Sequence, residues 1–324
     1  MSKAIVINEF GGPEVLQWQH IELPAPGPHE VRIAHHAVGL NFIDTYQRSG
    51  LYPLELPSGL GLEAAGRVTA VGAAVDDFAV GDAVAYTSMP PGAYAEERNY
   101  PAAKLVKLPA EIDMETAAAA MLKGLTAWYL LHRSYPVQAG DTVLLYAAAG
   151  GVGVLAAQWA QHLGARVIGV VSTEAKAELA LRRGCSEVVM ADAADFVGRV
   201  RALTDGAGVA AVYDSVGRDT FMQSLDCLRP HGTMVSFGNA SGPVAPVAPL
   251  ELSKRGSLFL TRPVLFDFIA TPETLRAAAA ELFAVISSGA VDIEIGQSWP
   301  LADVAAAHRA LESRRTQGST LLLP

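Results

Sequence analysis

The first third of the chain alternates short apolar stretches with turns. Strand-like segments such as VRIAHHAVGL, GRVTAVG, DAVAYTS and KLVKLP are separated by glycine and proline turns up to about residue 110. A long helix is then expected through ETAAAAMLKGLTAWYLLHR, with Asp113 as its N-cap and Glu115 in its first turn. The pattern therefore predicts a β-rich, barrel-like module that ends near this helix.

The middle of the chain alternates strand and helix patterns instead. The order is DTVLLYAA, a helix through GVGVLAAQWAQHLG, ARVIGVVS, a helix from Glu174, EVVM, a helix from Ala194, AVYDSVG, a helix from Thr220, and GTMVSFG. This alternation predicts a parallel doubly wound sheet. The segment SLFLTRPVLF is expected to add an edge strand, and the last helices and the strand STLLLP are expected to return to the first domain.

Composition narrows the class of protein. Hydrophobic residues make up 51% of the 324 residues, yet no apolar run reaches the roughly 18 residues of a membrane-spanning helix. Lys plus Arg is 24 and Asp plus Glu is 33, and the resulting net charge of −9 disfavours nucleic acid as a partner. With only Cys185 and Cys227, and a strand-like start MSKAIVINEF in place of a secretion signal, we expect a cytoplasmic enzyme with inert core thiols.

A glycine loop follows the first strand of the doubly wound part. The run Ala148-Ala149-Gly150-Gly151-Val152-Gly153 matches the dinucleotide fingerprint except for alanine in place of the first glycine. Gly150 would let the backbone approach a pyrophosphate, and Gly153 would let the helix pack against the strand. The alternative is an ordinary tight turn between strand and helix.

The end of the next strand bears on which dinucleotide binds. An acidic residue there would bind the ribose 2′-hydroxyl of NAD, but this strand ends in Val170-Val171-Ser172-Thr173 and is followed by Lys176. Hydroxyls and a cation suit the 2′-phosphate of NADPH. We therefore predict NADPH, although Glu174 leaves NADH open and Lys176 could be a solvated helix residue.

Several segments together resemble one family. NFIDTYQRSGLYP, PSGLGLEAAGRVTAVG, KGLTAWYLL, AAAGGVG, VYDSVGRD, MVSFGN and RRTQGS are similar to the quinone oxidoreductase branch of the medium-chain dehydrogenase/reductase superfamily, which includes zeta-crystallin. The resemblance covers nearly the whole chain. It implies a mixed α/β protein with a GroES-like catalytic domain of residues 1–122 and 266–324, a Rossmann domain of residues 123–265, and a cofactor cleft between them.

The resemblance also implies a set of cofactor contacts. They are Asn41, Tyr46, Gly150, Gly151, Val152, Ser172, Lys176, Ser215, Phe237, Gly238 and Leu265, with Arg314 closing the site from the far end of the chain. The family often stacks an aromatic or histidine ring near the adenosine, where this chain has Ala191.

Zinc-dependent relatives bind a catalytic metal through the histidine of a G-H-E motif. This chain has Gly61-Leu62-Glu63, and leucine cannot bind zinc. The eight histidines show no ligand spacing and are expected on the surface or in helices. We predict no metal, and we interpret Glu63 as a structural carboxylate more readily than as a catalytic one.

The resemblance implies hydride transfer from NADPH to a quinone, a reaction that needs little acid catalysis. Asn41 and Tyr46 are the expected hydrogen-bond donors to the acceptor oxygen. The alternative for Tyr46 is that it only packs against the nicotinamide ribose. Lys123 and Thr126 would bracket the nicotinamide, unless Lys123 is a helix-surface charge.

Two other functions stay open. One is an NADPH-dependent reductase of α,β-unsaturated ketones, and the other is a non-catalytic crystallin-like or RNA-binding protein. The net negative charge counts against RNA binding.

The segment SLFLTRPVLF also bears on the oligomeric state. Pairing of this apolar edge strand with that of a second copy predicts a homodimer.

Overall fold

The computed structural model describes residues 2–324, which form two compact units. The first comprises the residues up to Leu125, Ile269–Ser287 and Ile293–Pro324, and the second comprises Thr126–Phe268 and Ser288–Asp292. This division differs from the expected boundaries in three places. Residues 123–125 fall in the first unit, and residues 266–268 and 288–292 fall in the second. Gln158 of the second unit bonds to both the N–H and the carbonyl of Asp292 at 3.0 Å each.

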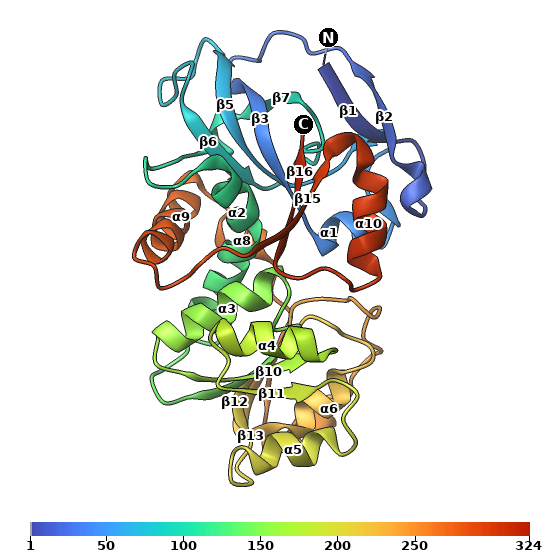
Figure 1. The fold of residues 1–324 in the computed structure, drawn as a ribbon, viewed down its shortest axis with the longest axis vertical. Helices are drawn as coiled ribbons and strands as arrows, with labels where there is room; N and C mark the ends of the chain where they lie inside the picture. Colours follow the sequence, from blue (N-terminus) through green and yellow to red (C-terminus); the bar gives the residue numbers. More distant parts are fainter. Residues whose placement is uncertain (1) are drawn as a thin grey trace. The chain divides into compact units, whose positions relative to one another are not determined.

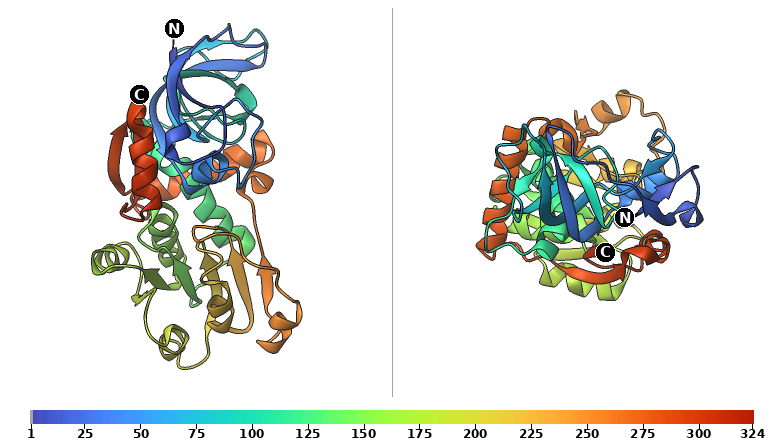
Figure 2. Two further views of the ribbon diagram at one scale, coloured as in Figure 1. Left: turned by 90° about the vertical axis from the view of Figure 1, so that its right-hand side faces the viewer. Right: turned by 90° about the horizontal axis from the view of Figure 1, so that it is seen from above.

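The first unit is built mainly from strands (Figures 1 and 2). Its larger sheet has the order β15 (Ile295–Pro300), β16 (Ser319–Leu323), β3 (Glu30–Leu40), β5 (Glu63–Val71), β6 (Ala83–Thr87) and β8 (Val106–Lys107), and β7 (Glu97–Pro101) also pairs with β3. A smaller sheet has the order β2 (Gln17–Ile21), β1 (Ser2–Ile7) and β4 (Ser58–Gly59). The chain comes back to this unit at its C-terminus, because β16 pairs antiparallel with β3.

The first unit contains two longer helices, α9 (Pro272–Ser287) and the part of α2 (Met114–Tyr129) up to Leu125. Its shorter α-helices include α1 (Phe42–Arg48) and α10 (Val304–Glu312). Asp113 caps α2 as predicted, since its side chain accepts from the Thr116 N–H at 2.7 Å and the Thr116 hydroxyl at 2.9 Å. After Tyr129 the helix widens into a π-helical turn over Leu130–Ser134.

The second unit contains one parallel sheet. Its order is β11 (Glu187–Met190), β10 (Arg166–Val171), β9 (Thr142–Tyr146), β12 (Val209–Asp214), β13 (Leu228–Ser236) and β14 (Phe259–Thr261). The connecting helices are α3 (Gly151–His162), α4 (Glu174–Arg182), α5 (Phe196–Ala202) and α6 (Phe221–Asp226). Right-handed crossovers place α3 and α4 on one face of the sheet and α5 and α6 on the other. The mixed α/β class with a doubly wound sheet is confirmed.

The strand order reverses between β9 and β12. The chain steps from β9 to β10 and β11 on one side, and from β12 to β13 and β14 on the other. Loops that leave the carboxyl ends of adjacent strands at such a reversal diverge and leave a crevice where ligands bind. This edge of the second unit is therefore its candidate ligand site.

The far edge of the same sheet is exposed and apolar. β14 is the outer strand, as SLFLTRPVLF predicted, and Phe259 and Leu260 keep 61% and 41% of their surface accessible.

Among residues 2–324, no helix combines the length and apolar character needed to cross a membrane.

Candidate functional site

The glycine loop of the second unit has the geometry that its sequence predicted. Gly150 is the extended N-cap of α3, so the N–H groups of the first helical turn lack helical partners. At Gly153 a Cβ atom would lie 2.2 Å from the Ala147 carbonyl oxygen, so only glycine allows α3 to pack this closely on the loop. Gly151 and Val152 form the first turn and are half-buried. The backbone can therefore meet an anion at this helix start.

The end of β10 carries hydroxyls and a lysine. Ser172 is exposed, Thr173 caps α4 by accepting from the Lys176 N–H at 3.3 Å, and the Lys176 side chain is half-buried. Glu174, the acidic residue because of which NADH stayed an alternative cofactor, is exposed in the first turn of α4. Ala191, where the family places a ring, is exposed just after β11.

The ends of β12 and β13 complete this edge. Ser215 follows β12, and Phe237 and Gly238 follow β13. A Cβ on Gly238 would lie 2.3 Å from the Ser215 carbonyl oxygen, so glycine is needed where these two loops meet. Leu265 begins the short helix α8 (Leu265–Phe268) and is buried, as is Thr126 at the start of the unit.

A buried carboxylate that sequence reasoning missed holds the Ser215 loop. Asp214 accepts from the N–H groups of Val216 and Gly217 at 2.7 and 3.0 Å, and from the hydroxyls of Thr220 and Ser224 at 2.7 and 3.0 Å. Its signal was an acid at the end of an apolar strand, followed by a glycine and a threonine. Asp214 is fully satisfied and fixes the loop rather than facing a ligand.

In the first unit a buried carboxylate brings three elements together. Glu63, at the start of β5, accepts from Lys123 Nζ at 2.9 Å, from Asn41 Nδ2 at 2.8 Å and from the Leu122 N–H at 2.6 Å. The Glu63 side chain is inaccessible, and that of Lys123 is only 5% exposed. A Cβ on Gly39 would lie 2.1 Å from Glu63 Oε2, so the carboxylate occupies the space that a glycine in β3 leaves.

These contacts revise two expectations. Lys123 is not a helix-surface charge, because it is buried in an ion pair with Glu63. Asn41 was expected to donate to the acceptor oxygen, but its amide nitrogen already donates to Glu63 at 2.8 Å and to the Gly39 carbonyl at 3.4 Å. The structure thus places the Asn41 amide within the Glu63 cluster.

Tyr46 lies in the same helix that Asn41 caps. Its ring is half-buried and meets the Tyr52 ring edge-on, with a centroid distance of 5.3 Å. Arg314 lies after α10 in the same unit and is exposed, with a left-handed φ of 58°. Asn41, Tyr46, Lys123 and Arg314 therefore belong to the first unit, and the other predicted site residues belong to the second.

Two histidines are buried, and one contradicts the expectation for this residue type. His35 lies in β3, neither in a helix nor on the surface, and its Nδ1 contacts the Ala95 carbonyl at 2.7 Å while Nε2 contacts the Tyr86 hydroxyl at 3.0 Å. Burial lowers the pKa of His35 to about 4. His308 in α10 is also buried, and burial lowers its pKa to about 3. Both rings are neutral hydrogen-bonding groups of the core.

Within residues 2–324 no group of three or more His, Cys, Asp and Glu side chains is arranged to hold a metal ion. Leu62, at the position where zinc-dependent relatives have a histidine, is buried and inaccessible. The two cysteines are also buried, and burial raises the pKa of each thiol to about 12. They are unreactive thiols at neutral pH.

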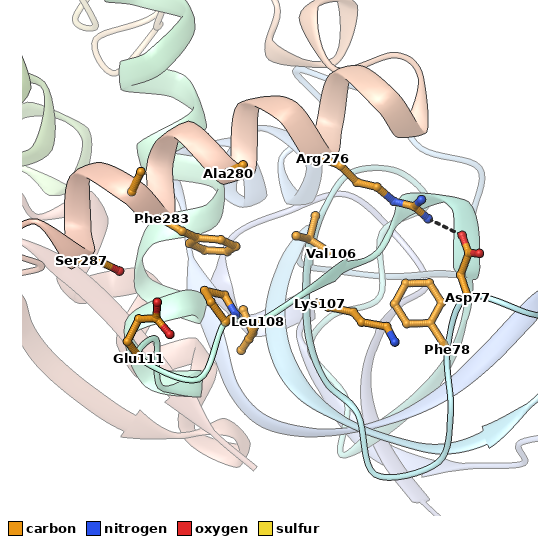
Figure 3. A pocket seen from close by; sticks show the side chains of 12 residues that line it. Asp77, Phe78, Val106, Lys107, Leu108, Glu111, Arg276, Ala280, Phe283 and Ser287 are labelled. Carbon is orange, nitrogen blue, oxygen red and sulfur yellow. Dashed lines mark hydrogen bonds and ion pairs between the residues drawn. The ribbon is translucent and has the colours of Figure 1, made fainter.

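A separate pocket lies in the first unit (Figure 3). It encloses about 700 Å³ between α9 and β8 and is lined by apolar side chains such as Phe78, Leu108 and Phe283. Arg276 is paired with Asp77 at 2.9 Å at one end. None of the predicted site residues lines this pocket, and we do not assign the reaction to it.

Comparison with known proteins covers the whole chain. Residues 27–110 match the family model "Alcohol dehydrogenase GroES-like domain", and residues 151–283 match "Zinc-binding dehydrogenase". The chain is 53% identical to a quinone oxidoreductase of Pseudomonas aeruginosa and 45% identical to a 2-haloacrylate reductase of a Burkholderia species. The alignments cover all of this chain and 100% and 99% of those proteins, respectively.

A solved structure is also similar over the full length. The Escherichia coli quinone oxidoreductase complexed with NADPH is 48% identical, with a TM-score of 0.97, and the match covers 99% of this chain and 100% of that chain.

The Glu63–Lys123 pair generates a stability prediction. Lys123→Met would leave the Glu63 carboxylate buried without its cation, so we expect a loss of about 3–5 kcal/mol in the free energy of unfolding. Adding Glu63→Gln should recover much of the loss, because the uncompensated charge is then removed. Urea unfolding of both variants measures this. Equal stability of Lys123→Met and wild type would show that the pair does not matter.

Proposed function

Since the chain belongs to the quinone oxidoreductase branch of the medium-chain dehydrogenase/reductase superfamily, we propose that it is an NADPH-dependent quinone oxidoreductase that works without a metal ion. The observation that carries this conclusion is identity of 53% over its full length to a quinone oxidoreductase. The solved relative complexed with NADPH, at 48% identity, supports the cofactor.

The carboxyl edge of the second unit fits NADPH. The free N–H groups at the start of α3 suit a pyrophosphate, and Gly150 removes a side chain where the backbone must approach it. Ser172 and Lys176 offer a hydroxyl and a cation to the 2′-phosphate, at a strand end without an acid. We assign Ser215, Phe237, Gly238, Leu265 and Thr126 to the remaining contacts of this unit. When bound, NADPH supplies the hydride.

We assign the quinone-facing role in the first unit to the α1 segment. Tyr46 is the donor we propose for the quinone oxygen, where negative charge develops as hydride arrives. Asn41, held by Glu63, and Lys123 shape the adjoining nicotinamide contact, and Arg314 closes the site from the end of α10. A quinone accepts hydride readily because its product is aromatic, so the reaction needs no Lewis acid. Leu62 can therefore occupy the position where zinc-dependent relatives have a metal ligand.

One relative favours a second candidate function. The 2-haloacrylate reductase at 45% identity is named for a substrate with a carbon–carbon double bond conjugated to a carboxylate. Reduction of α,β-unsaturated carbonyl compounds by NADPH is therefore the alternative we keep. A non-catalytic crystallin-like or RNA-binding role is the third, and the net charge of −9 counts against RNA.

We also propose a cytoplasmic location. Two buried, free cysteines are what a protein that needs no disulfide in a reducing compartment contains.

Acceptor choice is tested by NADPH oxidation at 340 nm. We expect faster turnover with 1,4-benzoquinone than with an open-chain enone, because the quinone needs no Lewis acid, and we expect no change on adding a chelator. Tyr46→Phe should lower kcat for the quinone about tenfold through loss of one hydrogen-bond donor. Enone reduction without quinone turnover would replace the proposed function by the alternative.

Cofactor choice rests on Lys176. We expect Lys176→Ala to raise the KM for NADPH about tenfold, because a charge-assisted contact to the 2′-phosphate is lost, and to leave the KM for NADH unchanged. Lys254→Ala is the matched control, since Lys254 lies in the same unit and pairs only with Glu251 on the surface. An equal rise for both cofactors would contradict the 2′-phosphate role.

Self-association through β14 is our proposal for the oligomeric state. Antiparallel pairing of two β14 strands would cover Phe259 and Leu260 and satisfy the open edge. Light scattering should give twice the 34.0 kDa chain mass for wild type and one chain mass for Leu260→Lys. Leu181→Lys, at an exposed leucine of α4, should remain dimeric. A monomeric wild type at micromolar concentration would refute the homodimer.

A further inference from the structure

A series of hydrogen-bonded side chains, buried except for Glu312, runs from α10 to the start of α1. Arg48 binds Glu312 through two hydrogen bonds of 2.6 and 3.1 Å, and its Nη1 contacts His308 Nδ1 at 2.9 Å. His308 Nε2 then contacts the Tyr94 hydroxyl at 3.1 Å, and Tyr94 donates to Asp44 Oδ2 at 2.7 Å. Asp44 Oδ2 also accepts from the Asn41 N–H at 2.8 Å. All of these groups belong to the first unit.

The direction of each hydrogen bond follows from Arg48. A guanidinium can only donate, so His308 Nδ1 is the acceptor and Nε2 carries the proton. Nε2 therefore donates to the Tyr94 oxygen, which leaves the Tyr94 hydroxyl proton for Asp44. The Tyr94 hydroxyl is thus a donor of fixed orientation to Asp44. Asp44 in turn accepts from the Asn41 backbone N–H and so fixes its position.

Asp44 is the third residue of α1 and anchors its first turn. Its carboxyl is inaccessible to solvent, and its other oxygen, Oδ1, has no hydrogen-bond partner among the described residues. A negative charge at this position also interacts favourably with the helix N-terminus. Tyr46, the proposed donor to the quinone, lies two residues after Asp44 in the same short helix. Asn41 is the N-cap of this helix.

We propose that Asp44 is a positioning residue for quinone reduction: by holding the Asn41 N–H and the Tyr94 hydroxyl, it fixes the first turn of α1 and thereby the placement of Asn41 and Tyr46. The proposal rests on the function proposed above. Tyr94, His308 and Arg48 support Asp44 from behind, and none of these groups needs to touch the quinone or the cofactor.

The burial of Asp44 makes this role sensitive to pH. Lys123 of α2 and Arg48 of α1 are the nearby cations, and Glu63 of β5 and Glu312 of α10 are the nearby anions, while Tyr94 and the neutral His308 face it as hydrogen-bonding groups. Burial raises the pKa of Asp44 to about 7, against the lowering effect of the Tyr94 and Asn41 hydrogen bonds and of Lys123. Only the ionised carboxylate is a strong acceptor for both donors.

A rise in pH has opposite effects on the stability of the protein and on catalysis. Because the folded pKa lies above the ordinary value of 3.8, the folded chain binds more protons than the unfolded chain between pH 4 and 7, and the contribution of Asp44 to stability falls as pH rises through that window. Its hold on Asn41 and Tyr94 strengthens over the same rise. Catalysis should therefore improve as pH increases through about 7.

Asp44→Asn tests the role because it keeps the shape and removes the charge. We expect kcat with 1,4-benzoquinone to rise through an apparent pKa near 7 in wild type, and to be about tenfold lower and flat over this range in Asp44→Asn. The KM for NADPH should change less than kcat, because the phosphate contacts proposed for NADPH lie in the second unit and only the Asn41 contact depends on Asp44. Asp77→Asn, at an exposed carboxylate of the same unit, should retain the wild-type profile.

Tyr94→Phe is the second variant. Loss of a hydrogen bond that lowers the pKa of Asp44 should move the midpoint of the kcat profile to higher pH, even if Asp44→Asn does not fold. An unchanged profile in either folded variant would overturn the positioning role. If wild type turns over an enone and not the quinone, the proposed function fails, and the same comparison is made with the enone. If wild type turns over neither, both proposals are overturned.

Discussion

The buried Glu63 carboxylate is the constraint around which the first unit is organised. A charge removed from water needs an opposite charge and full hydrogen bonding, and Glu63 obtains both from α2 and from the N-cap of α1. Gly39 in β3 leaves the space for it. The same carboxylate thereby sets the place of Asn41 and Lys123. Leu62, the preceding residue in the chain, is buried beside this ion pair.

The second unit meets a different constraint, the close approach of backbone to backbone. Gly153 and Gly238 stand where a single carbon atom would overlap a neighbouring carbonyl oxygen, and Asp214 holds one of these loops through its hydrogen bonds to N–H and hydroxyl groups. These features set the conformation of the loops at the carboxyl edge of the sheet, where we propose that the dinucleotide binds. In the proposed function, this edge binds the cofactor and the α1 segment positions the groups that face the acceptor.

Local features were predictable from sequence, and distant contacts were not. The strand–helix alternation, the cap at Asp113 and the glycine at 153 depend on neighbours in the chain, so their patterns could be read directly. The Glu63–Lys123 pair spans 60 residues, and the Tyr94–His308 contact spans 214, which no local pattern encodes. For the same reason the sequence did not indicate that Asn41 donates to Glu63 or that His35 is buried in β3. The resemblance to a family supplied the candidate residues, but the hydrogen bonds that orient them required coordinates.

The proposed function depends on direct hydride transfer from NADPH to a quinone without a metal ion. The most direct test is single-turnover oxidation of NADPH deuterated at C4, followed at 340 nm with excess benzoquinone and a chelator. Deuterium on one face of the ring should slow the absorbance decay about two- to fourfold, deuterium on the other face should not, and the chelator should change neither rate. Loss of the decay on chelation, or equal rates for both deuterated forms and unlabelled NADPH, would rule out direct hydride transfer without a metal ion.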